Sequence, residues 1–234
     1  MIIGLVGLKG CGKDTAADFF IEHAIEQSIN GYDSWIKGSF ADSLKDTCAC
    51  VFGWDREMLE GSTHESREWR EKEDTWWAEK LNRPGFTPRI ALQLVGTDLW
   101  RNQFHDGIWL LSFEKKLLTI KENVIITDCR FPNEIDLIKQ LGGIIVRVKR
   151  GEDPVWWDTA VEDNARRNEP YYNPMVPQAY PEVHASEHSW PGCDVDYTIY
   201  NDGTFDDLEN VIKNLEQDPL ASKVFQDLKS LQSS

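Results

Sequence analysis

In the stretch Met1-Ile-Ile-Gly-Leu-Val-Gly7-Leu-Lys-Gly-Cys-Gly12-Lys13-Asp14-Thr15, a short apolar run comes directly before two glycines, Gly7 and Gly12, that bracket four residues. A lysine and then a hydroxyl residue follow. This is the sequence form of a phosphate-binding loop. Glycines let successive backbone N–H groups turn toward phosphate oxygens, and the helix that follows adds its positive N-terminal end. A coincidental glycine turn is the alternative, but at average residue frequencies such a match arises less than about once in a hundred chains.

The residue after the lysine of this loop is unusual. Asp14 stands where a serine or threonine usually follows, and the hydroxyl comes one place later, at Thr15. Adenylate-kinase-like enzymes delay the threonine in the same way, whereas switch GTPases use the immediate hydroxyl on Mg²⁺. The spacing therefore favours a small-molecule kinase, with Lys13 at the terminal phosphates and Thr15 as the candidate Mg²⁺ residue.

Composition restricts the class of partner. The chain has 234 residues, 41% of them hydrophobic, and a formal net charge of −15. A protein this acidic lacks the basic face that binding to a nucleic acid polymer requires, so the expected nucleotide is a small ligand. Its five cysteines are scattered and fit neither a disulfide framework nor a metal set. No signal peptide or apolar run of membrane length is recognisable, so we expect a cytosolic protein that binds no membrane.

Helical and strand patterns alternate along the chain. Apolar runs at 2–6, 123–128, 144–148 and 195–200, with a shorter one at 34–37, predict an α/β fold with a parallel sheet of about five strands and helices on both faces. We expect one P-loop kinase domain over residues 1–234 with two insertions. The first, about 55–82, is strongly charged, and the second, about 151–190, is irregular and rich in proline and aromatic residues.

A second group of candidates follows the strand at 123–128. Asp128 and Arg130 stand at its carboxyl end, where parallel sheets bind their ligands. The carboxylate can orient an attacking oxygen, and the guanidinium can bind a phosphate through two donors. The structural alternatives are a helix cap for Asp128 and a surface ion pair for Arg130.

Other motifs remain ambiguous from their residue types alone. Arg67 and Arg89 could be solvated charges, and Gly96-Thr97 could end a helix. Arg166-Arg167 could clamp phosphate or face solvent. His184 and His188, near Glu187, lack a third ligand at metal-site spacing, so we expect them to be lid or hydrogen-bonding residues. The pairs Trp76-Trp77 and Trp156-Trp157 could be ordinary core filling, or, because their surroundings are polar, they could line a site or stabilise a flap.

Taken in order, these motifs resemble bacteriophage deoxynucleoside monophosphate kinases, a P-loop family related to the nucleoside monophosphate kinases. The resemblance is carried by G-K-D-T-x-A-D-F at 12–19, R-x6-G-T-D-L at 89–99, Trp109, D-x-R-x3-E at 128–134 and Asn201-Asp-Gly203. It covers nearly the whole chain and implies transfer of the γ-phosphoryl group of ATP to a deoxynucleoside monophosphate, with Mg²⁺, in the cytoplasm of an infected bacterium. The stretch 151–183 looks longer than this family would suggest.

The resemblance also implies roles for individual residues. Lys13, Asp128 and Arg130 would be catalytic, and Thr15 would hold Mg²⁺. The ATP site would comprise Lys9, Gly10, Cys11, Gly12, Lys13, Asp14, Thr15, Arg150, Asp202 and Gly203. The monophosphate site would comprise Arg67, Arg89, Gly96, Thr97, Trp109, Asp128, Arg130 and Glu134.

Two other functions remain open. The chain could be another P-loop kinase of a small metabolite, such as a dephospho-coenzyme A or phosphomevalonate kinase, which share the strand–loop–helix start. It could also be a nucleotide-binding regulator, although arginines outside the loop argue for a second anion site that a regulator does not need. The sequence leaves open which bases are accepted, and whether the enzyme forms a homodimer.

Overall fold

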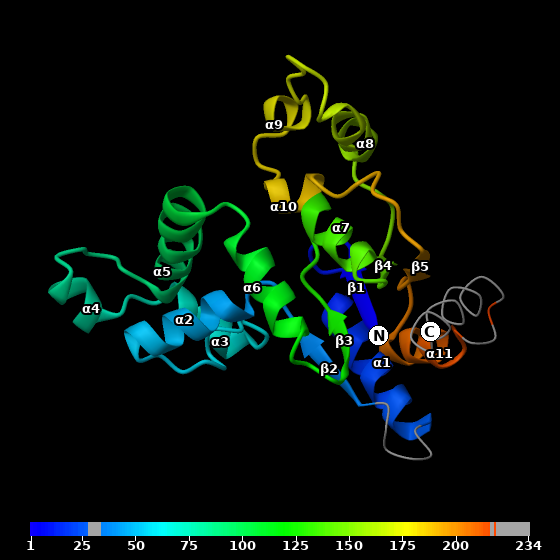
Figure 1. The fold of residues 1–234 in the computed structure, drawn as a ribbon, viewed down its shortest axis with the longest axis horizontal. Helices are drawn as coiled ribbons and strands as arrows, with labels where there is room; N and C mark the ends of the chain where they lie inside the picture. The colour runs from blue at the N-terminus through cyan, green and yellow to red at the C-terminus, as the bar shows by residue number, and fades with distance from the viewer. Residues whose placement is uncertain (28–33, 216–217, 219–234) are drawn as a thin grey trace. The chain divides into compact units, whose positions relative to one another are not determined.

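The computed structural model describes residues 1–27, 34–215 and 218. It divides into two compact units (Figure 1). We call the first, residues 1–39 and 120–234, the sheet unit, and the second, Phe40–Thr119, the helical unit. The expected acceptor insertion at 55–82 lies inside the helical unit, which is considerably larger. The sequence pattern also predicts an amphipathic helix after Asp218, and this segment lies outside the described residues.

The sheet unit is built on parallel strands in the order β2-β3-β1-β4-β5. Within the described residues they form the five-stranded parallel sheet that the sequence predicts. The strands are β1 (Ile2–Val6), β2 (Trp35–Gly38), β3 (Asn123–Ile126), β4 (Ile144–Lys149) and β5 (Tyr197–Tyr200). The helices of this unit are α1 (Lys13–Gln27), α7 (Pro132–Gln140), α8 (Trp157–Arg166), α9 (Val176–Ala179), α10 (Ala185–His188) and α11 (Phe205–Lys213).

Alternation along β1 gives the sheet its two covered faces. Ile3 and Leu5 point into a core shared with α1 and α11, where Leu208 and Ile212 are buried. Gly4 faces the other side, and a Cβ there would lie 2.6 Å from Ile138 of α7. Since successive residues of a strand face opposite sides, α1 and α11 cover one face and α7 covers the other. The result is the three-layer P-loop kinase fold.

The second expected insertion contains more regular structure than the sequence indicates. The stretch 151–191, expected to be irregular, contains α8, α9 and α10. Asp163 of α8 organises it, because its buried carboxylate accepts hydrogen bonds from the Tyr172 hydroxyl (2.5 Å) and from the N–H groups of Met175 (2.9 Å) and Val176 (2.8 Å). These donors belong to residues in an irregular stretch of backbone, so no periodic sequence pattern predicts the contacts.

An arginine joins this segment to the sheet. The guanidinium of Arg147 on β4 lies 4.1 Å from the ring centroid of Trp157 and 5.5 Å from that of Trp190. It also pairs with Asp153. Such a cation between two indole faces is a favourable contact inside a protein. The Trp156-Trp157 pair, for which the sequence left two roles open, therefore contributes Trp157 to packing.

The helical unit consists of short helices. They are α2 (Asp42–Phe52), α3 (His64–Glu71), α4 (Thr75–Lys80), α5 (Pro88–Gln93), the π-helical segment η1 (Leu94–Phe104) and α6 (Ile108–Leu117). The apolar pattern after Pro88 predicts a helix, and one begins there, but it widens into a π-helix at Leu94. Trp54 and Trp77 hold the chain of this unit together, since their indole N–H groups donate to Asp74 (2.7 Å) and to the carbonyl of Phe52 (3.0 Å).

Candidate functional site

The phosphate loop lies between β1 and α1. Gly10 and Gly12 have φ values of 81° and 95°, which side-chain-bearing residues rarely adopt. Cys11 between them is buried and donates its N–H to the carbonyl of Leu8 (3.2 Å). Asp14 lies exposed in the first turn of α1, followed by the half-buried Thr15. The backbone is therefore folded as an anion-binding loop needs, with a helix N-terminus behind it.

Lys13 is buried in this loop, with 7% of its surface exposed. Its Nζ donates to the carbonyl oxygens of Gly7 (2.7 Å) and Leu8 (3.1 Å). An ammonium has three donors and no acceptor, so these carbonyls satisfy two of them. The amine is thus held over the loop, where it could exchange carbonyl oxygens for phosphate oxygens.

Asn201, which the sequence did not single out as a loop residue, clamps the phosphate loop from the end of β5. Its buried side-chain amide donates to the carbonyl of Cys11 (2.9 Å), and its own N–H donates to the carbonyl of Lys149 (2.7 Å). A Cβ on Gly12 would lie 2.5 Å from that amide nitrogen, so the second glycine is also needed for this close approach. Only the Asn-Asp-Gly motif in the sequence pointed to this position.

Asp128 and Arg130 follow the carboxyl end of β3, as expected. The carboxylate of Asp128 accepts a hydrogen bond from the hydroxyl of Ser39 (2.6 Å), which follows β2. Cys129 between them is fully buried, and burial raises the pKa of its thiol well above the ordinary value. The two predicted side chains are therefore placed on either side of a buried anchor, at the ligand-binding end of the sheet.

Glu134 has a positioning role in this arrangement. Its buried carboxylate accepts hydrogen bonds from the N–H groups of Arg130 (2.8 Å) and Phe131 (3.0 Å) at the start of α7. A carboxylate that caps two free amides at a helix N-terminus fixes the entering backbone. Glu134 therefore orients Arg130 through the main chain.

The guanidinium of Arg130 meets a residue far away in the sequence. Its Nη1 donates to Oε1 of Glu187 on α10 at 2.5 Å, and the other oxygen of Glu187 accepts the N–H of Lys9 at 2.8 Å. Arg130 is thus in an ion pair, as one of the alternatives had it, but in one that also includes the phosphate loop. The sequence had noted Glu187 only as a neighbour of His184 and His188. In the part of the chain that the structure describes, no group of three or more metal-ligating side chains occurs.

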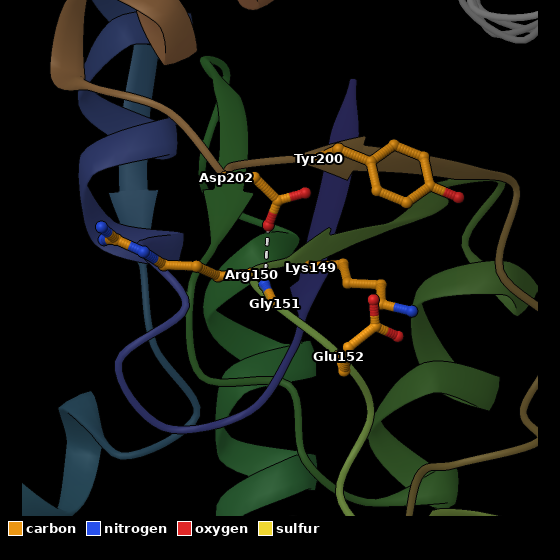
Figure 2. Close-up of a pocket in the computed structure, with 6 residues that line it drawn as sticks. All are labelled: Lys149, Arg150, Gly151, Glu152, Tyr200 and Asp202. Carbon is orange, nitrogen blue, oxygen red and sulfur yellow. Dashed lines mark hydrogen bonds between the residues drawn. The ribbon is translucent and has the colours of Figure 1, made fainter.

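The carboxyl ends of β4 and β5 form an open pocket of about 460 Å³ (Figure 2). It is lined by Lys149, Arg150, Gly151, Glu152, Tyr200 and Asp202. The N–H of Gly151 donates to the carboxylate of Asp202 (2.6 Å), which ties the two strand ends together. The side chain of Arg150 extends away from Lys149 and Glu152 (Figure 2). Gly203, next to Asp202, precedes the N-cap residue of α11.

The remaining candidates belong to the helical unit. Arg67 on α3 is exposed, and its guanidinium donates to the carbonyls of Gly61 (3.0 Å) and Ser62 (2.9 Å). Arg89 on α5 lies 3.3 Å from a carboxylate oxygen of Glu71. The two arginines share a neighbour, Arg70, whose pKa is lowered by burial and by the charges of Arg89 and Arg67. The structure therefore adds Arg70 to the positive charges near the two predicted arginines.

Gly96, Thr97 and Trp109 are organised around η1. The buried indole of Trp109 donates its N–H to the carbonyl of Gly96 (2.9 Å). A Cβ on Gly96 would lie 2.7 Å from the side chain of Leu44, so α2 and η1 approach closely at this glycine. Thr97, the next residue, is exposed. Trp109 thus fixes the backbone that presents Thr97.

The lid candidates Arg166 and Arg167 are both exposed. Arg166 pairs with Glu169 at 3.0 Å and lies 4.3 Å from the ring centroid of Tyr172, while Arg167 lies near Cys193.

None of the helices described by the structure has the length and apolar character to cross a membrane.

Comparison with known proteins identifies the family. Residues 63–164 match the family model described as deoxynucleotide monophosphate kinase. A protein of Acanthamoeba polyphaga mimivirus with the provisional name deoxynucleotide monophosphate kinase is 36% identical over 162 residues, which is 64% of this chain and 74% of the relative. The chain belongs to the deoxynucleotide monophosphate kinase family.

A second relative of this kinase is the deoxynucleoside-5'-monophosphate kinase of Escherichia phage T5. It is 46% identical over 55 residues, covering 23% of this chain and 22% of the phage protein. The family model spans Arg67, Arg89, Gly96, Thr97, Trp109, Asp128, Arg130 and Glu134. The resemblance to this family that the motifs indicated is thereby confirmed, together with the α/β fold.

Proposed function

We propose that this chain is an ATP-dependent deoxynucleoside monophosphate kinase that produces a deoxynucleoside diphosphate and ADP. The observation that carries the proposal is the phosphate loop with its buried Lys13, together with Asp128 and Arg130 at the ligand-binding end of the same sheet. Family membership and the names of both viral relatives support the same activity.

In the proposed reaction an oxygen of the acceptor's phosphate attacks the γ-phosphorus of ATP. The bond between that phosphorus and the β–γ bridging oxygen breaks, and its electron pair leaves with ADP. No side chain forms a covalent intermediate, so the protein's contribution is positioning and charge stabilisation. Lys13 and the loop amides from Lys9 to Thr15 would hold the ATP phosphates, and Arg130 would hold the acceptor phosphate with two parallel donors.

Asp128 is proposed as the third catalytic residue. Its carboxylate accepts a hydrogen bond from the hydroxyl of Ser39. This contact fixes one carboxylate oxygen and orients the group at the end of β3. A carboxylate there can align the attacking oxygen or the water shell of a bound cation.

Magnesium is the expected cofactor of ATP, and the residues of this chain suit it. Mg²⁺ usually retains waters and binds substrate phosphates with one or two protein oxygens, so it needs no preformed cage. Thr15, half-buried in the first turn of α1, would supply a hydroxyl ligand. When bound, the cation would neutralise charge on the β- and γ-phosphates.

The two predicted insertions have separate proposed roles. The region 55–82, with Arg67 and its neighbours Arg89 and Arg70, would bind the acceptor together with Gly96, Thr97 and Trp109 of the same unit. Glu134 would serve the acceptor through Arg130, whose backbone it orients. The region 151–190 would act as a lid over ATP, and Arg150, Asp202 and Gly203 would lie beside the adenine. We place the enzyme in the cytoplasm of an infected bacterium, because one relative belongs to a bacteriophage.

A coupled ADP-release assay tests this function. The purified chain is given ATP and Mg²⁺ with each deoxynucleoside monophosphate, each ribonucleoside monophosphate, dephospho-coenzyme A and phosphomevalonate. We expect turnover with at least one deoxynucleoside monophosphate and far less with the other acceptors. Turnover confined to dephospho-coenzyme A or phosphomevalonate would favour the other P-loop kinases that share this start, and ATP binding without transfer to any acceptor would favour a regulator.

A further inference from the structure

Glu187 occupies an unusual position for an acidic residue. Each of its two carboxylate oxygens accepts a hydrogen bond from a different part of the phosphate site: one from the N–H of Lys9 in the loop, the other from the guanidinium of Arg130. The Glu187 side chain is only 17% exposed. Arg130 also lies 3.5 Å from the hydroxyl of Ser186, the preceding residue.

The two donors are of the kind that bind phosphate. A loop amide beside a helix N-terminus and a guanidinium both recognise oxyanions, and both do so more strongly when the acceptor is charged. A carboxylate and a phosphoryl group offer them the same chemistry, namely anionic oxygens. Glu187 therefore satisfies the two donors in the way that substrate oxygens would.

The anchoring of Glu187 allows it to leave without unfolding its surroundings. It lies on α10, a helix of four residues, Ala185–His188. The C-terminal end of this helix and the residues after it are held by Asn164 of α8, whose side-chain amide donates to the carbonyls of His188 (2.9 Å) and Pro191 (2.8 Å). Those contacts involve neither Lys9 nor Arg130, so they can persist while the carboxylate moves away.

We propose that Glu187 is an internal substitute for substrate phosphate, a latch that the incoming polyphosphate displaces. The inference rests on the proposed function, in which Lys9 and Arg130 serve as phosphate donors. One amide N–H cannot serve two oxyanions equally well, and two anions at one site repel each other. Phosphate binding therefore breaks both Glu187 contacts and frees α10 together with the guanidinium of Arg130.

The latch links the two substrates to the lid segment. Until polyphosphate reaches Lys9, Glu187 occupies the guanidinium that would receive the acceptor. Once ATP displaces it, Arg130 is released, and α10 becomes free to adopt another position within the segment 151–190. Part of the binding free energy of the ligand is used to break the Glu187 contacts, so the latch weakens the apparent affinity for polyphosphate.

Binding of inorganic tripolyphosphate to Glu187→Gln tests the latch. The substitution preserves the shape of the side chain but removes its charge. We expect isothermal titration calorimetry to show tripolyphosphate binding about fivefold more tightly to this variant than to the parent chain, the scale of one partly exposed charge-assisted contact. The amide proton of Lys9, followed by NMR without ligand, is expected to shift upfield as it loses a charged acceptor.

Glu182→Gln is the matched control. It removes one carboxylate from the same segment at an exposed position. If both variants bind tripolyphosphate more tightly than the parent chain, and by the same factor, the effect comes from net charge and the latch is wrong. Unchanged or weaker binding by Glu187→Gln would also overturn it, and weaker binding would indicate that Glu187 instead holds Arg130 for substrate.

The test is independent of the phosphoryl acceptor. It measures equilibrium binding of a probe without a nucleoside or a transfer step. If the acceptor assay fails while Glu187→Gln tightens tripolyphosphate binding, the latch holds and only the proposed acceptor is wrong. If transfer to deoxynucleoside monophosphates is found but tripolyphosphate binding does not tighten, the proposed function holds and the latch is abandoned.

Discussion

The phosphate loop and the arginines of the helical unit offer positive charge in two different ways. In the loop, the donors are mostly backbone N–H groups, and the one lysine is buried and held by two carbonyl oxygens. On α3 and α5, the donors are long side chains, of which Arg67 and Arg89 are exposed. The first arrangement exists before a ligand arrives, whereas exposed side chains lose conformational freedom when they bind one.

This difference predicts how variants of the two regions should behave. Damage to the preformed loop should reduce catalysis for every acceptor. Damage to an exposed arginine should be confined to the substrate that it touches. The following substitutions are arranged from the largest expected effect to the smallest.

Lys13→Ala is expected to lower kcat/KM by at least about a thousandfold for every acceptor. The amine neutralises charge that develops on the transferred group, and this kind of electrostatic stabilisation is among the largest contributions to catalysis. Steady-state kinetics measure the loss, and circular dichroism reports whether the fold is retained. Lys37→Ala, which removes a lysine paired with Asp18 elsewhere on the sheet unit, serves as the control. Near-normal turnover by folded Lys13→Ala would refute a preformed catalytic loop.

Arg67→Ala should raise the KM for the acceptor by about a hundredfold, because it removes a charged hydrogen-bond donor worth up to about 3 kcal/mol. The KM for ATP should stay within about twofold of the parent value. Initial-rate kinetics with each substrate varied in turn separate the two. Arg83→Ala removes the same charge from an exposed position of the helical unit. Equal changes in both KM values would show that Arg67 is not dedicated to the acceptor.

Asp163→Asn should reduce the free energy of unfolding by about 2 kcal/mol. The asparagine side chain has an NH2 group in place of one carboxylate oxygen, so at least one of the buried donors around it loses its acceptor. Burial alone would raise the pKa of Asp163, but hydrogen bonds from Met175, Tyr172 and Val176 outweigh it, and the pKa lies below its ordinary value. The stabilisation is therefore complete above the pKa of the unfolded chain, about 3.9, and is lost as the pH falls through the lower folded value.

Urea unfolding at several pH values checks this prediction. The gap between Asp163→Asn and the parent chain should be constant near neutral pH and should narrow below about pH 4. Asp158→Asn, at an exposed position of the same helix, is the control. A gap that widens as the pH falls would contradict the role assigned to the carboxylate.

Asn201→Ala should raise the KM for ATP by about fivefold, since the loop loses one buried hydrogen bond worth roughly 1 kcal/mol and gains room to move. The KM for the acceptor should change little. Asn214→Ala removes an asparagine from an exposed helix end and should affect neither constant. If Asn201→Ala changed only the acceptor constant, the proposed division between the two regions would have to be redrawn.

The features that the sequence predicted well are those that depend on a regular backbone geometry. A glycine–lysine loop after an apolar strand leaves a regular pattern, and so do buried parallel strands, because the same residue types are needed wherever that geometry occurs. The fold and the position of Asp128 after β3 were therefore both accessible from local patterns.

The features that the sequence missed depend on single contacts between residues that lie far apart along the chain. Asn201 meets Cys11 at a separation of 190 residues, and Glu187 meets Lys9 at a separation of 178. No periodicity or spacing links such pairs. The helices within 151–191 were missed for a related reason, since Asp163 stabilises this segment through donors on irregular backbone.

The clamp of Asn201 on the phosphate loop also bears on the order in which the enzyme is made. The ribosome adds Asn201 190 residues after Cys11 of the loop. At roughly 5–20 residues per second, synthesis of that interval takes about 10–40 s. Throughout this interval the nascent chain carries an incomplete nucleotide site, and ATP cannot assist its folding through the finished loop until β5 and Asn201 have emerged.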